Sequence, residues 1–506
     1  MSGRTIVSAP GKVLLTGGYL VLDREYQGLV VGADSRFYTV VDPANSDASS
    51  DVPIISVKSP QFLDGSWTYE LHVRPGHVDL RPLDESQPRN PYVEAALVNA
   101  LDVVCLSNPN CEDLLGKGLD ITIVGSNDFY SQREQLARRS LPLTSASLAA
   151  LPPFCEALTK ISKVHKTGLG SSAAMITSLV GAILSHFGAV SFNVKAIPRE
   201  LGLLTDLTGM RLVHNTAQLA HCIAQGNVGS GFDVSAAVYG SHTYRRFSPT
   251  VLSTYIKQQA ARAHAVDDAP AVLSVVNPAE GAWDNEIEPF ALPPRFTLML
   301  ADIDAGSSTP KLVSKVLEWR KNEPEQANAL WSRLGAANSE LERLLRELKR
   351  LARERSTCYG AVVNFLAPLK AATWEQLDAA SCQGLDSQVI RSFVSIHSSF
   401  LRIRGFLREM SAATQVPIEP AEQTRLLDAC MDVPGIIMAG VPGAGGFDAI
   451  FCIALSEAAR ENVETVWQGW TEMAVAPLLA RQSSVGICSI HALEDVPGLL
   501  QSITNH

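Results

Sequence analysis

The chain has 506 residues, of which 46% are hydrophobic and 19% charged, and its formal net charge is −10 at pH 7. This composition is typical of a folded globular protein, and the length predicts two or more domains. The acidic balance argues against a nucleic-acid partner, and no segment has the roughly 20 unbroken apolar residues of a membrane helix. Lys12, Gly17 and Gly18 interrupt the first apolar runs, so no signal peptide is expected and the protein is predicted to be cytoplasmic.

The nine cysteines are scattered and form no CxxC pair. Most stand in apolar surroundings, as Cys452 does between Phe451 and Ile453. This pattern predicts reduced core residues rather than a disulfide framework or a zinc site. The final Thr504, Asn505 and His506 match no peroxisomal address.

Short apolar runs separated by glycines predict consecutive strands from Thr5 to Val41. Residues 42–53 are polar and predict a turn or a surface insertion. The following patterns predict strands at 53–57 and 67–73, a helix at 90–106, a strand at 119–124 and an exposed loop at 130–153.

Within the first strands, Ala9-Pro10-Gly11-Lys12 predicts a turn that directs one cation from a fixed backbone. A surface lysine in an ordinary turn is the alternative interpretation of this tetrapeptide.

A glycine-serine loop, HKTGLGSSAAMIT at 165–177, runs directly into an apolar stretch of helical character. Gly168 and Gly170 permit a tight backbone path and close approach to a ligand. Ser171 and Ser172 then stand where a helix begins, beside free N–H groups and the positive end of its dipole. The loop therefore predicts a phosphate site, with a serine-capped turn as the alternative.

Two further glycine clusters each precede an aspartate, at 225–233 (QGNVGSGFD) and at 440–448 (GVPGAGGFD). In the first, three glycines around Asp233 suggest a carboxylate held against a close backbone. An Asp233 that merely caps a helix from Val234 onward is the alternative. The second cluster alone indicates no more than a flexible turn.

In the second half of the chain, the polar stretch 257–294 predicts a domain junction. A strand follows at 296–303, and a loop enters a helix at Thr309-Pro310-Lys311. Leucines recur at helical spacing from Leu330 to Leu351 and predict one side of a packed helix rather than a coiled coil.

Taken in order, the four motifs resemble those of the GHMP kinase superfamily: APGK at 9–12, GLGSSAA at 168–174, GSGFD at 229–233 and PGAGGFD at 442–448. Within it, the segments GGYLVLD at 17–23, QGNVGSGFDVSAAVYGS at 225–241 and GSSTPKLV at 306–313 resemble the eukaryotic, especially fungal, phosphomevalonate kinase family. Mevalonate kinases would show Gly-Glu-His where Gly17-Gly18-Tyr19 stands. Diphosphomevalonate decarboxylases differ in the first motif and lack the GSSTP segment.

The resemblance implies an α+β GHMP kinase fold. Its N-terminal α/β domain, similar to ribosomal protein S5 domain 2, would hold the first three motifs and span 1–256. A connecting segment at 257–294 would lead to a C-terminal ferredoxin-like α+β domain at 295–506, with the active site between the two domains. The implied reaction is ATP-dependent phosphorylation of (R)-5-phosphomevalonate to (R)-5-diphosphomevalonate, with ATP and Mg²⁺ as cofactors and a monomer or weak dimer as the assembly.

The resemblance also implies roles for single residues. Lys12 and Asp233 would be catalytic, and Ser172 would contact Mg²⁺. The ATP phosphates would lie on Lys166, Gly168, Leu169, Gly170, Ser171, Ser172 and Ala173. The phosphorylated acceptor calls for further groups, expected at Tyr19, Ser230, Gly231, Arg245, Ser307, Ser308, Thr309, Lys311 and Gly445. An ordinary capped helix is the alternative interpretation of the helix start at 309–311, and a solvated charge is the alternative for Lys166. Since Arg245 and Arg246 are adjacent on a predicted strand, at most one of them should face the site.

One position departs from the related kinases. Mevalonate kinases place an acidic metal ligand eleven residues before the aspartate, where this chain has Cys222, flanked by His221. Mg²⁺ demands oxygen ligands, so the metal shell should depend on Ser172, ATP oxygens and water, with Asp233 as a further contributor.

Two other functions stay open at this point. One is a GHMP kinase that acts on a different small alcohol or phosphate. The other is a catalytically silent ligand sensor, against which the intact Lys12, Ser172 and Asp233 weigh.

Overall fold

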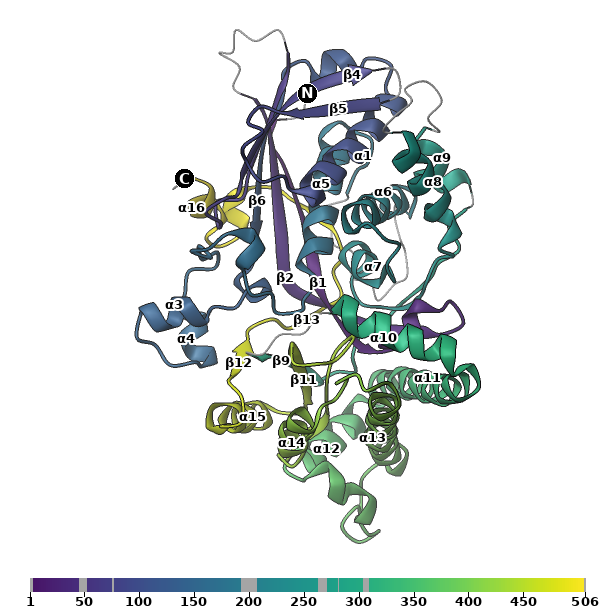
Figure 1. Ribbon diagram of the computed structural model, residues 1–506. Coiled ribbons are helices and arrows are strands. Elements are labelled where there is room, and N and C mark those ends of the chain that lie inside the picture. Colours follow the sequence, from purple (N-terminus) through teal and green to yellow (C-terminus); the bar gives the residue numbers. More distant parts are fainter. Residues whose placement is uncertain are drawn as a thin grey trace.

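The computed structural model describes residues 3–44, 52–74, 77–192, 207–262, 271–280, 282–303 and 309–504. The chain forms two lobes (Figure 1), each built on its own β-sheet. The N-terminal lobe comprises residues 3–289 together with 482–504, and the C-terminal lobe comprises residues 297–478. None of the helices in these ranges is long and apolar enough to cross a bilayer.

The sheet of the N-terminal lobe has ten strands, in the order β14-β1-β2-β6-β3-β4-β5, with β13 and β7 paired to β2 and β8 paired to β7. The bounds are β1 Thr5–Thr16, β2 Gln27–Pro43, β3 Ile54–Lys58, β4 Ser66–Arg74, β5 His77–Pro82, β6 Leu119–Gly125, β7 His242–Arg245, β8 Glu286–Pro289, β13 Gln482–Ser483 and β14 Cys488–Ile490. Only β3 and β6 pair in parallel among these described strands.

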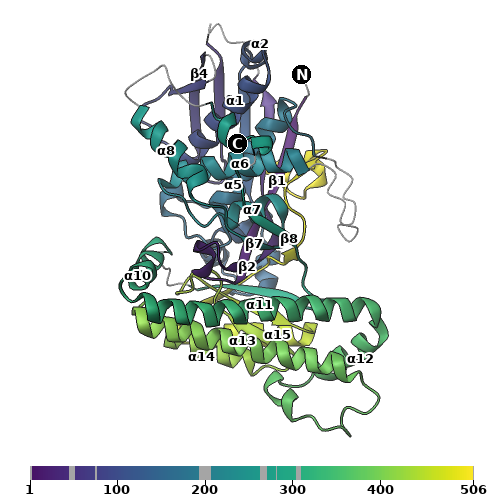
Figure 2. The same ribbon diagram turned by 90° about the vertical axis from the view of Figure 1, so that its right-hand side faces the viewer.

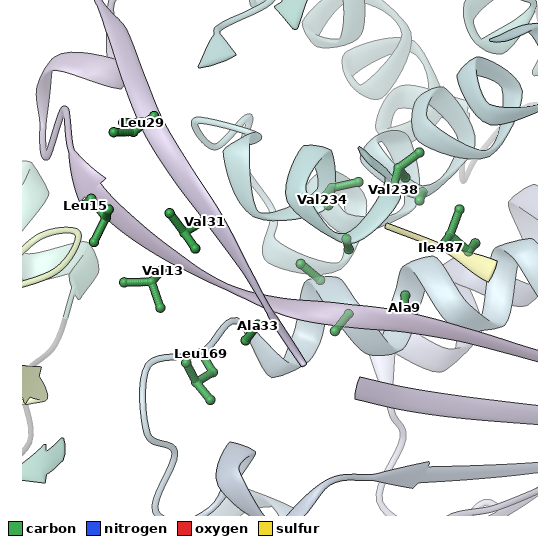
Figure 3. Packing of buried hydrophobic residues seen from close by; sticks show 14 of the residues in the cluster. Ala9, Val13, Leu15, Leu29, Val31, Ala33, Leu169, Val234, Val238 and Ile487 are labelled. Atoms are coloured by element: carbon green, nitrogen blue, oxygen red, sulfur yellow. The ribbon is translucent and has the colours of Figure 1, made fainter. Parts of the chain in front are cut away.

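Helices cover one face of this sheet. They are α1 Pro91–Ser107, α5 Ser171–His186, α6 Leu207–Gln225 and α7 Phe232–Tyr239, which contact one another, while α5 and α7 lie directly on β1 and β2. Their apolar side chains and those of the strands share one buried cluster. Figure 3 shows this packing, with Val13 and Val31 from the strands, Val234 from α7 and Leu169 from the loop before α5. The glycine loop is thereby anchored in the core through Leu169, which is 3% exposed.

Further helices lie at the periphery of the N-terminal lobe: α2 Cys111–Leu115, α3 Arg133–Arg138, α4 Ser145–Ala149, α8 Thr250–Arg262, α9 Leu273–Val276 and α16 Leu499–Thr504. The predicted exposed loop at 130–153 is therefore wrong in part, because it contains α3 and α4 and because Leu136 and Leu148 are buried. The predicted polar insertion at 42–53 falls mostly on residues outside the described ranges.

The C-terminal lobe has a four-stranded antiparallel sheet in the order β10-β11-β9-β12. The bounds are β9 Thr297–Ile303, β10 Ile436–Gly440, β11 Ala449–Ala454 and β12 Val475–Leu478. In chain order this is the strand arrangement 4-1-3-2 with helices after the first and third strands. The predicted ferredoxin-like α+β topology is confirmed.

The helices of this lobe are α10 Thr309–Asn322, α11 Pro324–Glu354, α12 Ser356–Leu366, α13 Ser387–Thr414, α14 Ala421–Met431 and α15 Glu457–Gly469. Figure 2 shows α11 and α13 side by side along the base of the molecule. The leucine stripe predicted from 330 to 351 is buried, with Leu345, Leu348 and Leu351 at 0% exposure. The stripe is thus one side of a packed helix, as predicted.

One cysteine prediction is wrong. The structure pairs Cys105 with Cys111 in a disulfide, which links the end of α1 to the start of α2. Their separation of six residues carries no CxxC-like signal, so the sequence pattern gave no reason to expect a bond. Cys155, Cys222, Cys430 and Cys452 are free and buried, as expected.

Candidate active site

The glycine loop meets α5 in the geometry of an anion site. Gly168 and Gly170 have φ angles of 80° and 78°, which only glycine adopts easily, and Gly170 caps the helix that begins at Ser171. Around Gly168 there is open space, since a Cβ built there would meet no atom within 4 Å. The predicted glycine loop before a helix is confirmed, and its N–H groups have the positive end of the α5 dipole beside them.

Lys12 is fixed against this loop. Its Nζ donates to the Gly168 carbonyl at 2.9 Å, and its backbone N–H donates to the Leu169 carbonyl at 2.9 Å. The ammonium also lies 5.3 Å from the centroid of the Phe232 ring. Burial lowers the pKa of Lys12, and the negative charges of Asp233 and Asp448 oppose that shift.

The turn predicted at Ala9-Pro10-Gly11-Lys12 is wrong, because these residues lie inside β1. A β-bulge between Pro10 and Lys12 interrupts the pairing with β2. Bulges re-aim side chains next to functional sites, and this one presents Lys12 to the glycine loop. Gly11 fits there because a Cβ would lie 2.9 Å from the Phe129 ring and 3.0 Å from the Leu169 carbonyl.

The third motif forms the start of α7. Gly231 has a φ of 82° and caps the helix, and Asp233 lies in the first turn, where its Oδ1 accepts from the Val234 N–H at 3.0 Å. The preceding loop is held by buried donors. Tyr244 donates to the Ser230 carbonyl at 2.8 Å, and Arg246 donates to the carbonyls of Val228 and Gly229.

His221, which sequence reasoning noted only as a neighbour of Cys222, is the residue of α6 that contacts the site. Its Nε2 lies 3.1 Å from Ser172 Oγ and 4.0 Å from Asp233 Oδ2. Cys222 is fully buried, and burial raises the pKa of its thiol to about 11. The sequence gives one signal for this contact: Cys222 stands where mevalonate kinases have an acidic residue, which draws attention to its neighbour His221.

A cleft lies between the two lobes and encloses about 870 Å³ of space, part of it open to solvent. Predicted site residues that line it are Lys12, Tyr19, Gly168, Leu169, Ser230, Thr309 and Gly445. Asp448, which was not predicted, lines it as well. The residues named here come from five segments that are far apart in the chain and are brought together beside the start of α5.

The lobes touch beside this cleft. Tyr19, which is 3% exposed, donates its hydroxyl to the Ala444 carbonyl at 2.7 Å, and the Gly443 N–H donates to the Leu14 carbonyl at 3.1 Å. Gly18 packs so tightly that a Cβ would lie 2.1 Å from the Gly443 oxygen. The loop of the fourth motif is therefore held by the N-terminal strands.

Other predicted residues lie elsewhere. Arg245 bonds Glu286 and the carbonyls of Arg24 and Glu25, so its side chain is directed away from the cleft. Lys166 and Lys311 are exposed and are not among the residues that line the cleft. Ser171, Ser172 and Ala173 form the first turn of α5 behind the loop. Ser307 and Ser308 lie outside the described residues.

A second cavity of about 930 Å³ shares Leu478 with the cleft and was not predicted. Arg133 and Asp302 face it, and their side chains approach to 3.5 Å between Nε and Oδ2. His165, just before the glycine loop, lies 3.2 Å from Asp302 Oδ1. The Asp302 side chain is 1% exposed and joins β9 of one lobe to α3 and the glycine loop of the other.

Comparisons with known proteins agree with this fold. A family model described as GHMP kinases C terminal matches residues 396–470. The peroxisomal phosphomevalonate kinase of Arabidopsis thaliana is 39% identical over 96% of this chain and 95% of its own. Phosphomevalonate kinase erg8 of Aspergillus fumigatus is 36% identical, over 88% of this chain and 86% of its own.

Solved structures share the fold at low identity. A Lin0012 protein from Listeria innocua matches with a TM-score of 0.61 at 15% identity, over 97% of this chain and 100% of that one. Phosphomevalonate kinase of Streptococcus pneumoniae, in complex with phosphomevalonate and AMPPNP, matches with a TM-score of 0.53 at 13% identity, over 94% and 99% of the two chains. Fold and site together define a small-molecule kinase of the GHMP type. With relatives above 30% identity along most of its length, the chain belongs to the phosphomevalonate kinase family.

Proposed function

We propose that this protein transfers the γ-phosphoryl group of ATP to (R)-5-phosphomevalonate, which yields (R)-5-diphosphomevalonate and ADP. The observation that carries the proposal is the meeting of Lys12 and the glycine loop at the start of α5, in a cleft between the lobes. Two anions must be brought together there although the protein is acidic overall. A cation and a helix N-terminus fixed on one wall supply the local attraction.

In the reaction an oxygen of the acceptor phosphate attacks the γ-phosphorus, and the bond to the β-phosphate oxygen breaks, so that ADP leaves. The attacking oxygen is already largely ionised at neutral pH, and a strong base is less necessary than for an alcohol. Positioning and charge stabilisation therefore dominate. Lys12 would neutralise charge between the two phosphates, and Asp233 would orient the acceptor or receive its residual proton.

We infer that the nucleotide phosphates bind the loop from Lys166 to Ala173 and that the base enters the second cavity. That cavity adjoins the loop, because Ser131 donates its N–H to the His165 carbonyl at 3.0 Å. Its wall also holds buried polar atoms without a protein partner, the hydroxyl of Ser131 and the amide oxygen of Gln132. Such atoms suit the polar edge of a base.

The side chains near Ser172 fit a magnesium ion. Ser172 Oγ and Asp233 Oδ2 both lie within 4.0 Å of the same nitrogen of His221, which places two oxygen ligands close together. The described residues hold no group of three or more His, Cys, Asp or Glu side chains suited to a metal. Mg²⁺ commonly takes one or two protein oxygens and completes its shell with phosphate and water. When bound, it would offset charge on the transferred group.

For the acceptor we propose the wall opposite the glycine loop. It contains Tyr19, Ser230, Thr309 and Gly445, which line the cleft, with Gly231 adjacent to Ser230. Lys311, in the first turn of α10, and the segment 307–308 would complete it. Arg245 is the weakest member of the predicted set because its guanidinium is already bonded to Glu286.

We also propose a division into domains at 1–256 and 295–506, a monomer or weak dimer, and a cytoplasmic location. The described α8 extends past 256, and β8 pairs with β7, so the connecting segment is partly built into the N-terminal lobe. Strands β13 and β14 pair with β2 and β1, so the described residues after 481 also lie in the N-terminal lobe although they fall in the second of these ranges. Light scattering at several concentrations tests the assembly. A fluorescent fusion tests the location, with peroxisomes as the contrary outcome.

A coupled assay of ADP release, with mevalonate and with phosphomevalonate as acceptors, tests the activity. Turnover of phosphomevalonate with Mg²⁺ present is the expected result. Turnover of mevalonate alone would overturn the assignment of the acceptor. Turnover of neither would favour a silent sensor.

A further inference from the structure

His221 contacts two residues of the site from behind. Its side chain is 3% exposed, and its ring lies against Tyr92 at a centroid distance of 5.9 Å. The same ring nitrogen, Nε2, faces Ser172 Oγ at 3.1 Å, Gln225 Nε2 at 3.3 Å and Asp233 Oδ2 at 4.0 Å. We propose that His221 is a positioning residue that engages the hydroxyl hydrogen of Ser172 and leaves its oxygen lone pairs directed away from α6, so that this hydroxyl serves as a cation ligand rather than as a phosphate donor.

The hydrogen-bond partners determine where the protons lie. The nitrogen of the Gln225 side-chain amide can only donate, so His221 Nε2 accepts from it. A ring nitrogen that accepts carries no hydrogen, so the contact with Ser172 requires the serine O–H as the donor, and the two donors share the one lone pair of Nε2, with Ser172 the nearer. With its only hydrogen committed to His221, Ser172 presents only lone pairs to any ligand bound beside it. An oxygen in that state binds a cation and cannot donate to a phosphate.

The contact between His221 and Ser172 compensates for the absence of an acidic metal ligand at Cys222. The thiol at that position is buried, and it hydrogen-bonds weakly with Gln218 at 3.9 Å on the side of α6. Asp233 Oδ2, at 4.0 Å from His221 Nε2, is too far for a hydrogen bond and stays available as an oxygen ligand. The chain thus replaces a charged ligand on α6 with a neutral imidazole that orients a hydroxyl ligand on α5.

The test rests on the proposed nucleotide and metal site but needs no turnover. Mn²⁺ is titrated into the protein with a non-hydrolysable ATP analogue, and free Mn²⁺ is read by electron paramagnetic resonance. His221→Gln keeps an acceptor oxygen near the position of Nε2, whereas the shorter His221→Asn does not reach it. We expect Mn²⁺ affinity near that of the wild type for His221→Gln and about tenfold weaker for His221→Asn, the lower end of what outer-shell changes cost.

A double-mutant cycle completes the experiment. Ser172→Ala should weaken Mn²⁺ binding. His221→Asn in that background should add no further loss, because both changes act on the same ligand, the Ser172 hydroxyl. His214→Asn is the matched control, since His214 is 1% exposed on the same helix and lies against Tyr239 and Trp283. It should leave Mn²⁺ affinity unchanged.

Wild-type affinity in His221→Asn, or full additivity with Ser172→Ala, would overturn the proposal. Equal losses in His214→Asn and His221→Asn would also overturn it, since they would indicate a general effect on α6. If the acceptor assignment were wrong, the ADP-release assay with phosphomevalonate would fail while this metal titration gave the expected pattern.

Discussion

At the scale of single residues, Lys12 is the group that links the glycine loop to the two acidic side chains of the site. Its Nζ is bonded to Gly168, while the charges of Asp233 and Asp448 act on it from α7 and from the C-terminal lobe. Since the acceptor already carries a phosphate, this cation should matter at least as much as the aspartate.

We therefore predict that Lys12→Ala lowers kcat by about 100-fold or more, the loss typical of removing one group that stabilises transition-state charge. Asp233→Asn should lower kcat by no more than Lys12→Ala does. Steady-state kinetics of ADP release with both substrates saturating provides the measurement. Near-normal kcat in Lys12→Ala together with loss of activity in Asp233→Asn would show that the order is reversed.

A second prediction concerns pH. Burial lowers the pKa of Lys12 from the ordinary 10.5, so the ammonium loses its proton at a lower pH than a free lysine. Activity that needs the charged form is present below this pKa and falls as the pH rises through it. Lys12→Arg keeps its charge at all these pH values, so its kcat, although lower, should lose the alkaline decline. The measurement is the profile of kcat from pH 7 to about 10.5 for the wild type and for Lys12→Arg. An unchanged decline in the arginine variant would contradict the role of Lys12.

Among the single residues, the structure confirms the predicted backbone of the glycine loop, and the chemical roles of the site residues stay predictions. The glycine loop needs its unusual φ angles whatever the surroundings, and Lys12, Gly168 and Ser230 follow motifs whose order is visible in the chain. His221, Asp302 and Arg133 could not be found, because their roles arise from contacts between segments far apart in sequence. Arg245 shows a limit of the pattern, since adjacent arginines on a strand do not reveal which one turns inward, and the Arg245 guanidinium is bonded to Glu286.

At the scale of elements, the start of α5 is the feature on which the site depends. Gly170 combines a φ of 78° with a close neighbour, because a Cβ would lie 3.0 Å from Cε of Lys12. Gly188, beyond the other end of the same helix, has a φ of 75° and no atom within 4 Å of such a Cβ. The two glycines share the backbone strain and differ in what surrounds them.

Gly170→Ala and Gly188→Ala should each lower the free energy of unfolding by about 1–2 kcal/mol, the cost of an L-residue in the left-handed region. Only Gly170→Ala should also reduce kcat, by about tenfold or more, because the new methyl group displaces Lys12 by a fraction of an ångström. Urea denaturation and kinetics of the two variants are compared. Equal activity in both would mean that the position of Lys12 tolerates this displacement.

Elements with strong periodicity were predicted well, including α1, β6, β9 and the leucine stripe of α11. The turn expected at residues 9–12 was not, because proline and glycine signal a turn while here they form a bulge inside a long strand. Short strands such as β13 and β14 carry too few residues to show alternation, and pairing with distant strands makes them form.

At the scale of the whole molecule, two sets of contacts hold the lobes together beside the cleft. One joins Tyr19 to Ala444, and the other joins Asp302 to Arg133 and His165. Arg133 also donates to the carbonyls of Asp302 and Ala474, each at 3.0 Å. Because the Asp302 side chain is almost completely enclosed, loss of its charge leaves Arg133 with these backbone carbonyls but without the buried carboxylate beside it.

We predict that Asp302→Asn lowers the free energy of unfolding by about 3 kcal/mol, as expected when one partner of a buried pair is lost. Glu134→Gln is the control, because Glu134 lies on α3 next to Arg133 and forms an exposed ion pair with Arg138. The side chains of Glu134 and Arg138 are 57% and 55% exposed. That change should cost less than about 1 kcal/mol. Equal denaturation midpoints for the two variants would show that the ion pair of Asp302 and Arg133 does not stabilise the protein.

The path of the chain between the lobes has a consequence for how the protein is made. Strands β13 and β14 leave the C-terminal lobe and pair with β2 and β1, the first strands to be synthesised. While the ribosome is still translating the intervening residues, the outer edge of β1 has no partner in this sheet and is open to pairing with other chains. The N-terminal lobe can therefore be completed only after residues 482–490 have emerged, so the C-terminal lobe can fold before the sheet that precedes it in the chain.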